Sequence, residues 1–216
     1  MSRSFHTEGA TVPLTTGRPL LIVDADEVLL AFAKGFDSFL GENGCYLDFS
    51  SYRLHGNVRR KDDNTALIDV EVTELLHDFR ADLHSLEPIE GALEAIAELQ
   101  QFMSIVALSN VSITQAPARL RNFAELGWDF PLVVNSGSKG RAVKVLAKRA
   151  RAPTFFMDDT PIHHESVADM APNVFRIHFV GDARLKPLMP PSPHAHFRAQ
   201  DWRDARNFIR SRLMEE

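Results

Sequence analysis

Short apolar runs recur along the chain and are separated by longer amphipathic stretches. The first run, LLIVDAD at 20–26, is aliphatic and ends in acidic residues. Four further apolar runs follow it at 104–108, 132–134, 154–157 and 174–180. Continuous aliphatic and β-branched runs of this length are typical of strands that are buried on both faces of a parallel sheet.

Between these runs, apolar residues recur with the period of a helix. In residues 88–101, Pro88 suits the first helical turn. The apolar residues that would share one face of this helix are Ile89, Leu93, Ile96 and Leu99. Residues 115–126 and 139–150 are also amphipathic, and Asp201 is placed to cap a closing helix. Strands that alternate with helices predict an α/β fold with a mainly parallel sheet.

One stretch interrupts the alternation of strands and helices. About eighty residues separate the first strand from the second, far more than a crossover connection needs. Residues 30–44 and 69–84 have helical patterns, whereas 45–68 are polar and irregular. The expected parts of the chain are a flexible arm at 1–18, an α/β core at 19–29 and 88–216, and a helical insertion at 30–87.

The composition of the chain bears on which partners it binds and on the compartment in which it works. The chain has 216 residues with 44% hydrophobic and 25% charged residues, which is ordinary for a globular protein. Its net charge of -5 argues against nucleic acid as the main partner, although a pocket can still bind a small anion. The single cysteine, Cys45, excludes an intramolecular disulfide and fits a reducing cytoplasm.

The apolar stretches also argue against a membrane. Three acids interrupt LLIVDADEVLLAFA, so this segment is unsuited to crossing a bilayer, and the first residues lack the apolar core of a secretory signal. We therefore expect a cytoplasmic protein with neither a membrane nor a nucleic-acid partner. The oligomeric state stays open.

Polar residues follow four of the predicted strands or their loops. They are Asp24 and Asp26, Ser109 and Asn110, Lys139 at a helix start, and Asp158 and Asp159. Ligands of open α/β sheets bind at the carboxyl ends of the strands. These residues are therefore expected to converge at one edge of the sheet.

The first acidic pair suits the two chemical steps of phosphoryl transfer. A carboxylate such as Asp24 can attack phosphorus and form an aspartyl-phosphate. Asp26, two residues further on, could protonate the leaving oxygen and then deprotonate the attacking water.

The remaining residues suit charge neutralisation. Mg²⁺ prefers oxygen ligands, so Asp159 is expected to complete a metal site with Asp158 as its neighbour or as an alternative ligand. Ser109 and Asn110 can donate hydrogen bonds to phosphate oxygens, and Lys139 supplies a positive charge.

These motifs resemble those of the haloacid-dehalogenase-like (HAD) superfamily. The resemblance lies in LLIVDADEV, IVALSN, SKGRAVKVLAKR and FFMDD, taken in this order, and it covers about residues 24–160. It implies a three-layer Rossmann-like sandwich with sheet order 5-4-1-2-3, counting the predicted strands along the chain. The insertion matches the position of the superfamily's helical cap of the first type.

The resemblance also implies roles for individual residues. Asp24 and Asp26 would be the nucleophile and the acid/base, and the metal would be bound by Asp24, the backbone carbonyl of Asp26, and Asp159. Superfamily members that cleave carbon–halogen bonds lack the second aspartate. The presence of Asp26 therefore favours a Mg²⁺-dependent phosphatase that acts on a small phosphate monoester.

Two departures and two alternatives accompany this hypothesis. Glu27 stands where many phosphatases of this class have glycine. Lys144 competes with Lys139 for the role of the positive charge in the site, and we prefer Lys139 because a helix start faces the strand ends.

A receiver-like signalling module is one alternative, but the third predicted strand is not followed by an acid. A catalytically silent relative that binds phosphate or a partner is the other. We interpret His163 and His164 as surface or packing residues.

Overall fold

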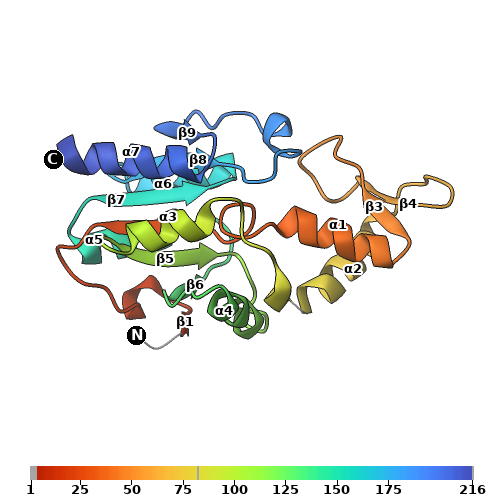
Figure 1. Cartoon of the computed structure of the whole chain (residues 1–216), viewed down its shortest axis with the longest axis horizontal. Helices are drawn as coiled ribbons and strands as arrows, with labels where there is room; N and C mark the ends of the chain where they lie inside the picture. Colours follow the sequence, from red (N-terminus) through yellow and green to blue (C-terminus); the bar gives the residue numbers. More distant parts are fainter. Residues whose placement is uncertain (1–3, 82, 216) are drawn as a thin grey trace.

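A computed structural model describes residues 4–81 and 83–215. Within this part of the chain, seven strands form one parallel sheet in the order β1-β6-β5-β2-β7-β8-β9 (Figure 1). The strands, in sheet order, are β1 (Phe5–His6), β6 (Leu132–Val134), β5 (Ser104–Ser109), β2 (Leu20–Val23), β7 (Thr154–Asp158), β8 (Phe175–Phe179) and β9 (Phe197–Ala199).

The inner part of the sheet confirms the predicted order. The strands β8, β7, β2, β5 and β6 are the predicted strands 5, 4, 1, 2 and 3. The central strand β2 is fully buried, and its last residue Val23 pairs with Ala107 of β5 and Met157 of β7. The two edge strands β1 and β9 were not predicted, because neither is an uninterrupted apolar run: β1 is Phe-His and β9 is Phe-Arg-Ala.

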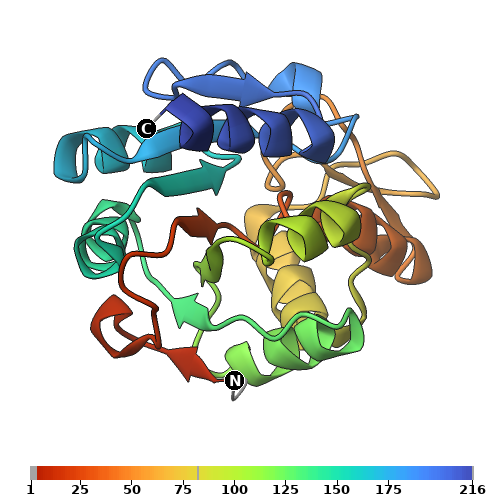
Figure 2. The same ribbon diagram turned by 60° about the vertical axis from the view of Figure 1, so that its left-hand side comes forward.

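Helices cover both faces of the sheet and make three layers. The helices on one face are α3 (Ala92–Leu99), α4 (Ala116–Glu125) and α7 (Trp202–Glu215), and those on the other are α5 (Gly140–Ala150) and α6 (Pro161–Met170) (Figure 2). Leu21 and Val23 face the first layer, whereas Leu20 and Ile22 face the second. Because successive strand residues point to opposite faces, an uninterrupted apolar strand is needed to fill both cores.

The helix expected over 88–101 begins later than predicted. The amide N–H of Ile89 donates to the carbonyl of Leu29, so this segment is still extended, and Gly91 is left-handed with φ of 79°. The helix therefore starts at Ala92, and Leu93 is 38% exposed rather than buried. The closing helix has its expected cap, because Asp201 Oδ1 accepts the N–H of Asp204 at 2.7 Å.

The insertion contains both helices and strands. Its elements are α1 (Phe32–Glu42), β3 (Cys45–Leu47), β4 (Val58–Arg60), α2 (Asp69–Ala81) and the 3-10 turn η2 (Leu83–Ser85). The expectation of an irregular 45–68 was wrong, because β3 and β4 pair antiparallel and bury apolar residues on one side. Figure 1 shows these elements beyond the carboxyl ends of the core strands. That residues 30–87 form a separate cap domain stays a prediction.

The N-terminal segment packs on the core instead of forming a loose arm. Strand β1 pairs with β6, and the 3-10 turn η1 (Gly9–Thr11) leads to Val12, which is fully buried. Arg149 on α5 holds this turn by donating to the carbonyl of Val12 at 2.7 Å. Residues 1–3 of the predicted arm lie outside the described residues. Among the described helices, none is both long and apolar enough to cross a membrane.

Candidate active site

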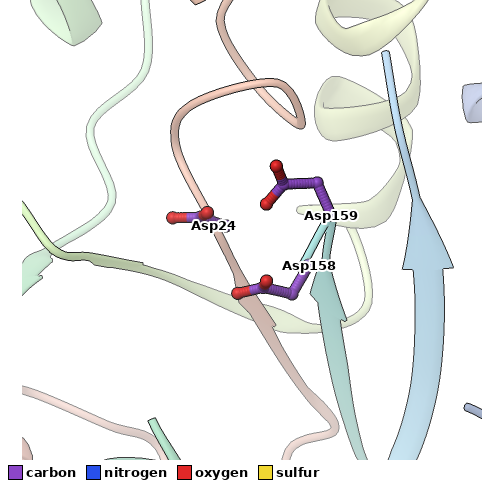
Figure 3. Close-up of side chains that lie close together, drawn as sticks. All are labelled: Asp24, Asp158 and Asp159. Atoms are coloured by element: carbon purple, nitrogen blue, oxygen red, sulfur yellow. The ribbon is translucent and has the colours of Figure 1, made fainter. Parts of the chain in front are cut away.

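Three carboxylates meet at the carboxyl ends of β2 and β7. Asp24 follows β2, its N–H donates to the carbonyl of Met157 at 2.9 Å, and this bond extends the pairing of the two strands. Asp158 is the last residue of β7, and Asp159 follows it. One carboxylate oxygen from each acid lies within 4.8 Å of the others, and the three side chains converge in Figure 3.

Lys139 lies between two of these acids. It precedes α5, its side chain is 1% exposed, and its Nζ is 2.7 Å from both Asp24 Oδ1 and Asp158 Oδ2. Lys144 is exposed and, with Pro153 and Phe175, lines a groove away from these carboxylates. Of the two candidate lysines, Lys139 is therefore the one that contacts the acidic cluster.

The cluster carries an excess of negative charge. Among the described residues, Lys139 contacts two of the three carboxylates, so two negative charges would remain if all three acids were ionised. Burial raises the pKa of Asp24 to about 7 against the lowering effect of Lys139, and burial followed by the charges of Asp158 and Asp24 raises the pKa of Asp159. Burial also opposes ionisation of Asp158, but Lys139 outweighs it and lowers the pKa of that carboxyl.

The donor set fits one divalent cation that prefers oxygen ligands. Asp158 is the least available ligand, because its Oδ2 is ion-paired with Lys139 and its Oδ1 accepts the N–H of Thr160 at 2.9 Å. By contrast, in the described part of the chain both oxygens of Asp159 accept only from neutral hydroxyl groups. Asp24 uses Oδ1 for Lys139 and for the N–H of Ala25, which leaves Oδ2 without a protein donor among the described residues. Oxygen ligands from ionised carboxylates, whose charge a divalent cation would balance, match Mg²⁺. Asp24 and Asp159 would hold it.

Asp26 is held by a buried arginine rather than by Lys139. Arg119 on α4 is fully buried, and its Nη2 donates to Asp26 Oδ1. The Asp26 side chain is nevertheless 34% exposed, more than Asp24 or Asp158. Arg119 therefore fixes the orientation of Asp26 while this carboxylate stays open to solvent.

Glu27 connects the loop after β2 to the insertion. It is 5% exposed and has a left-handed backbone with φ of 60°. Its Oε1 accepts the N–H of Ala33 at 2.6 Å in the first turn of α1, and its backbone carbonyl accepts the N–H of Gly181 at 2.7 Å. The residue that stands in place of the usual glycine thus caps α1 through its side chain.

We expect the substitution Glu27→Gln to stabilise the protein increasingly as the pH rises. Burial raises the pKa of Glu27 to about 7 in the folded chain, against 4.5 as its ordinary value. Between these values the unfolded chain loses the proton first. The free energy of unfolding of the native protein therefore falls by about 3 kcal/mol over this range, whereas that of the amide variant does not. Urea unfolding from pH 4 to pH 8, in the presence of a chelator, measures this difference.

The matched control is Glu94→Gln, because Glu94 is exposed on α3. The stability difference between this variant and the native protein should not change with pH. If Glu27→Gln gave an equally flat difference, the carboxyl of Glu27 would not be the group that titrates in this range.

Two buried histidines support the backbone of the Asp158–Asp159 pair. His164 Nε2 donates to the carbonyl of Asp158, and His178 Nε2 donates to the carbonyl of Asp159, both at 2.9 Å. The N–H of Ser192 donates to His178 Nδ1, which fixes the neutral tautomer of that ring. Burial lowers the pKa of His164 to about 4. The predicted packing role fits the burial of His164, which also holds the acidic pair in place.

Ser109 and Asn110 differ in their surroundings. Ser109 ends β5, is buried, and lies next to the Asp24 turn because Val23 pairs with Ala107. Asn110 is exposed. Its side-chain amide donates to the carbonyl of Gly137 at 3.0 Å, and its side-chain oxygen accepts from the amide of Asn135 at 2.7 Å. The amide of Asn110 thus holds the loop before Lys139, and the expectation that it donates to phosphate stays a prediction.

Sequence reasoning missed three residues around the site: Arg119, Tyr52 and His178. The sequence did indicate that Arg119 is buried, because it lies three residues after Ala116 and four before Phe123, on the buried face of α4. A charged residue on such a face requires a buried partner. The Tyr52 hydroxyl donates to Asp159 Oδ2 across 107 positions of sequence, and no local pattern predicts this contact.

Comparison with known proteins places this geometry in a structural class. No family model and no curated protein matches the sequence. Solved structures do match, including a HAD-superfamily hydrolase of subfamily IA from Geobacter sulfurreducens PCA. At 17% identity, the match covers 91% of this chain and 100% of that one, with a TM-score of 0.58.

Two further structures show the chemical range of the matches. A protein described as a HAD hydrolase from Bacillus subtilis, bound to magnesium, is 14% identical, with 90% and 99% of the two chains covered and a TM-score of 0.57. A defluorinating L-2-haloacid dehalogenase is also 14% identical, with 90% and 95% covered and a TM-score of 0.60. The chain therefore has the fold of the haloacid-dehalogenase-like superfamily.

Proposed function

We propose that this protein is a Mg²⁺-dependent phosphohydrolase that acts on a small phosphate monoester. The observation that supports the proposal most is the buried contact of Asp24 with Lys139, at 2.7 Å, beside Asp158 and Asp159. An acid in this position is oriented by two donors to its Oδ1, and among the described residues no protein group donates to its Oδ2. That is what a carboxylate nucleophile requires.

The chain's own residues can carry both steps of the reaction. The Asp24 carboxylate attacks phosphorus, the ester P–O bond breaks, and Asp26 gives its proton to the leaving oxygen. Water then attacks the aspartyl-phosphate, loses its proton to Asp26, and the bond between phosphorus and Asp24 breaks. Arg119 would keep Asp26 in the orientation that these proton transfers need.

The remaining charges stabilise the phosphoryl group. Lys139 and Ser109 would donate hydrogen bonds to its oxygens from the strand ends. A cation held by Asp24 and Asp159 would supply the positive charge that these carboxylates lack, and would reduce repulsion between the nucleophile and the phosphate. Asp158 would keep Lys139 in place through the contact of 2.7 Å.

Dehalogenation is the second candidate, because one matching structure is described as a haloacid dehalogenase. Two features of the site favour phosphate hydrolysis. Asp26, which the dehalogenating members lack, occupies the second acidic position here and is anchored by Arg119. The three acids of the cluster also lie close enough together to hold one divalent cation, which would balance their charge.

The test compares both reactions with the same purified protein. We expect phosphate release from an aryl phosphate with Mg²⁺, loss of release with a chelator, and no halide release from a 2-haloacid. Halide release without phosphate release would establish the dehalogenase instead. If neither product formed while phosphate or a fluoride mimic of it still bound, the protein would be a catalytically silent relative. A screen of phosphorylated metabolites would then identify the substrate of an active enzyme.

A further inference from the structure

The buried side chain of Asn57 bonds to three residues of the loop between β3 and β4, residues 48–57. The Asn57 amide donates to the carbonyl of Ser51 at 3.0 Å and to that of Arg53 at 2.7 Å. Its oxygen accepts the hydroxyl of Ser50 at 3.0 Å. A loop whose backbone carbonyls converge on one buried amide is preorganised, so Tyr52 inside it has a defined position.

This loop packs on the core beside the acidic cluster. Phe49 and Tyr52 contact an apolar cluster that includes Val180 and Leu185, in the segment that follows β8. The guanidinium of Arg184 lies 4.0 Å from the ring centroid of Phe49. Figure 1 shows the β3–β4 loop extending back toward this segment, so the insertion touches the core next to the candidate active site.

The hydroxyl of Tyr52 is the part of the loop that reaches the cluster. It donates to Asp159 Oδ2, while Asp159 Oδ1 accepts the hydroxyl of Thr160 at 3.1 Å. Burial, and then the negative charge of Asp159, raises the pKa of Tyr52, so its hydroxyl stays protonated. Two donors therefore hold the Asp159 carboxylate in one orientation, and one of them comes from the insertion.

We propose that Tyr52 is a positioning residue that couples docking of the 48–57 loop to binding of a divalent cation at Asp159. The inference rests on the cation site of the proposed function, but it does not depend on hydrolysis. Outer hydrogen bonds orient a carboxylate ligand, and their loss weakens metal binding. Because coupling between two sites is reciprocal, cation binding must also strengthen the docking of the loop.

The chain provides a matched pair of variants to test this coupling. Its two tyrosines both lie in the insertion, and the hydroxyl of Tyr46 donates to Asn64, away from the cluster. In calorimetric titrations of the full chain with Mg²⁺, we expect Tyr52→Phe to weaken binding about 10-fold and Tyr46→Phe to leave it unchanged. The variant Asn57→Ala, which frees the loop but keeps Tyr52, should also weaken binding.

Hydrogen exchange gives a readout that is independent of catalysis. Mg²⁺ should slow amide exchange in residues 48–57 of the native protein by a factor of about 10, and this protection should be absent in Tyr52→Phe. A lower melting temperature of Tyr52→Phe with native Mg²⁺ affinity would show a structural role only and would overturn the inference, while leaving the proposed function intact. No Mg²⁺ binding by the native chain would overturn the cation site and this inference together.

Discussion

The substitution Asp24→Asn should reduce phosphate release by about 10⁴-fold or more. An amide oxygen is a poor nucleophile toward phosphorus, and the aspartyl-phosphate can form only on a carboxylate. Initial rates with an aryl phosphate at saturating Mg²⁺ measure the loss. Mass spectrometry of acid-quenched native protein should find the phosphoryl group on Asp24, and the variant should lack it.

The loss should not come from unfolding. Asp24 is a buried acid among other acids, and burial raises its pKa to about 7, so a neutral side chain removes repulsion. The variant should therefore be at least as stable as the native protein in urea. As a control, Asp62→Asn changes an exposed acid in the turn after β4 and should keep native activity. Native activity in Asp24→Asn would exclude Asp24 as the nucleophile.

The substitution Lys139→Met should affect both stability and activity. Lys139 balances part of the charge of Asp24 and Asp158, each 2.7 Å from its Nζ. Burial alone would lower the pKa of Lys139, but these two carboxylates outweigh burial and raise it. Removing one partner of a buried ion pair leaves charge uncompensated, so we expect the free energy of unfolding to fall by about 3 kcal/mol. Phosphate release should fall at least about 100-fold.

Lys144→Met is the matched control, since Lys144 lies on the same helix but is exposed. Its free energy of unfolding should stay within about 0.5 kcal/mol of the native value, and its activity should be unchanged. Chemical unfolding in a chelator and initial rates in Mg²⁺ measure the two effects separately. Equal effects of the two substitutions would remove the reason for assigning Lys139 to the site.

The part of the site that lies on the strand ends was predictable from local sequence. Buried parallel strands appear as uninterrupted apolar runs, and their carboxyl ends share one edge of the sheet. This is why LLIVDAD and TFFMDD place Asp24 beside Asp158, and why NSGSKG brings Lys139 to them. The order of the inner strands followed from the resemblance of these motifs to a known superfamily.

The supporting residues were not predictable in the same way. The contact of Tyr52 with Asp159 depends on how the insertion folds and docks, and the two residues share no local pattern. The same holds for Glu27, which reaches Ala33 because its backbone turns into the left-handed region. At residues 88–91, strong helical periodicity was overridden by backbone pairing with Leu29, a tertiary effect that propensity does not contain.

The short edge strands have a consequence for the behaviour of the protein at high concentration. A long open strand at the margin of a sheet exposes unpaired amide and carbonyl groups that can recruit another chain. Here the sheet ends in β1 with two residues and β9 with three, so each margin offers few free groups in register. The sheets of two molecules are therefore poor partners for edge-to-edge pairing, although the inner strands are continuous and apolar.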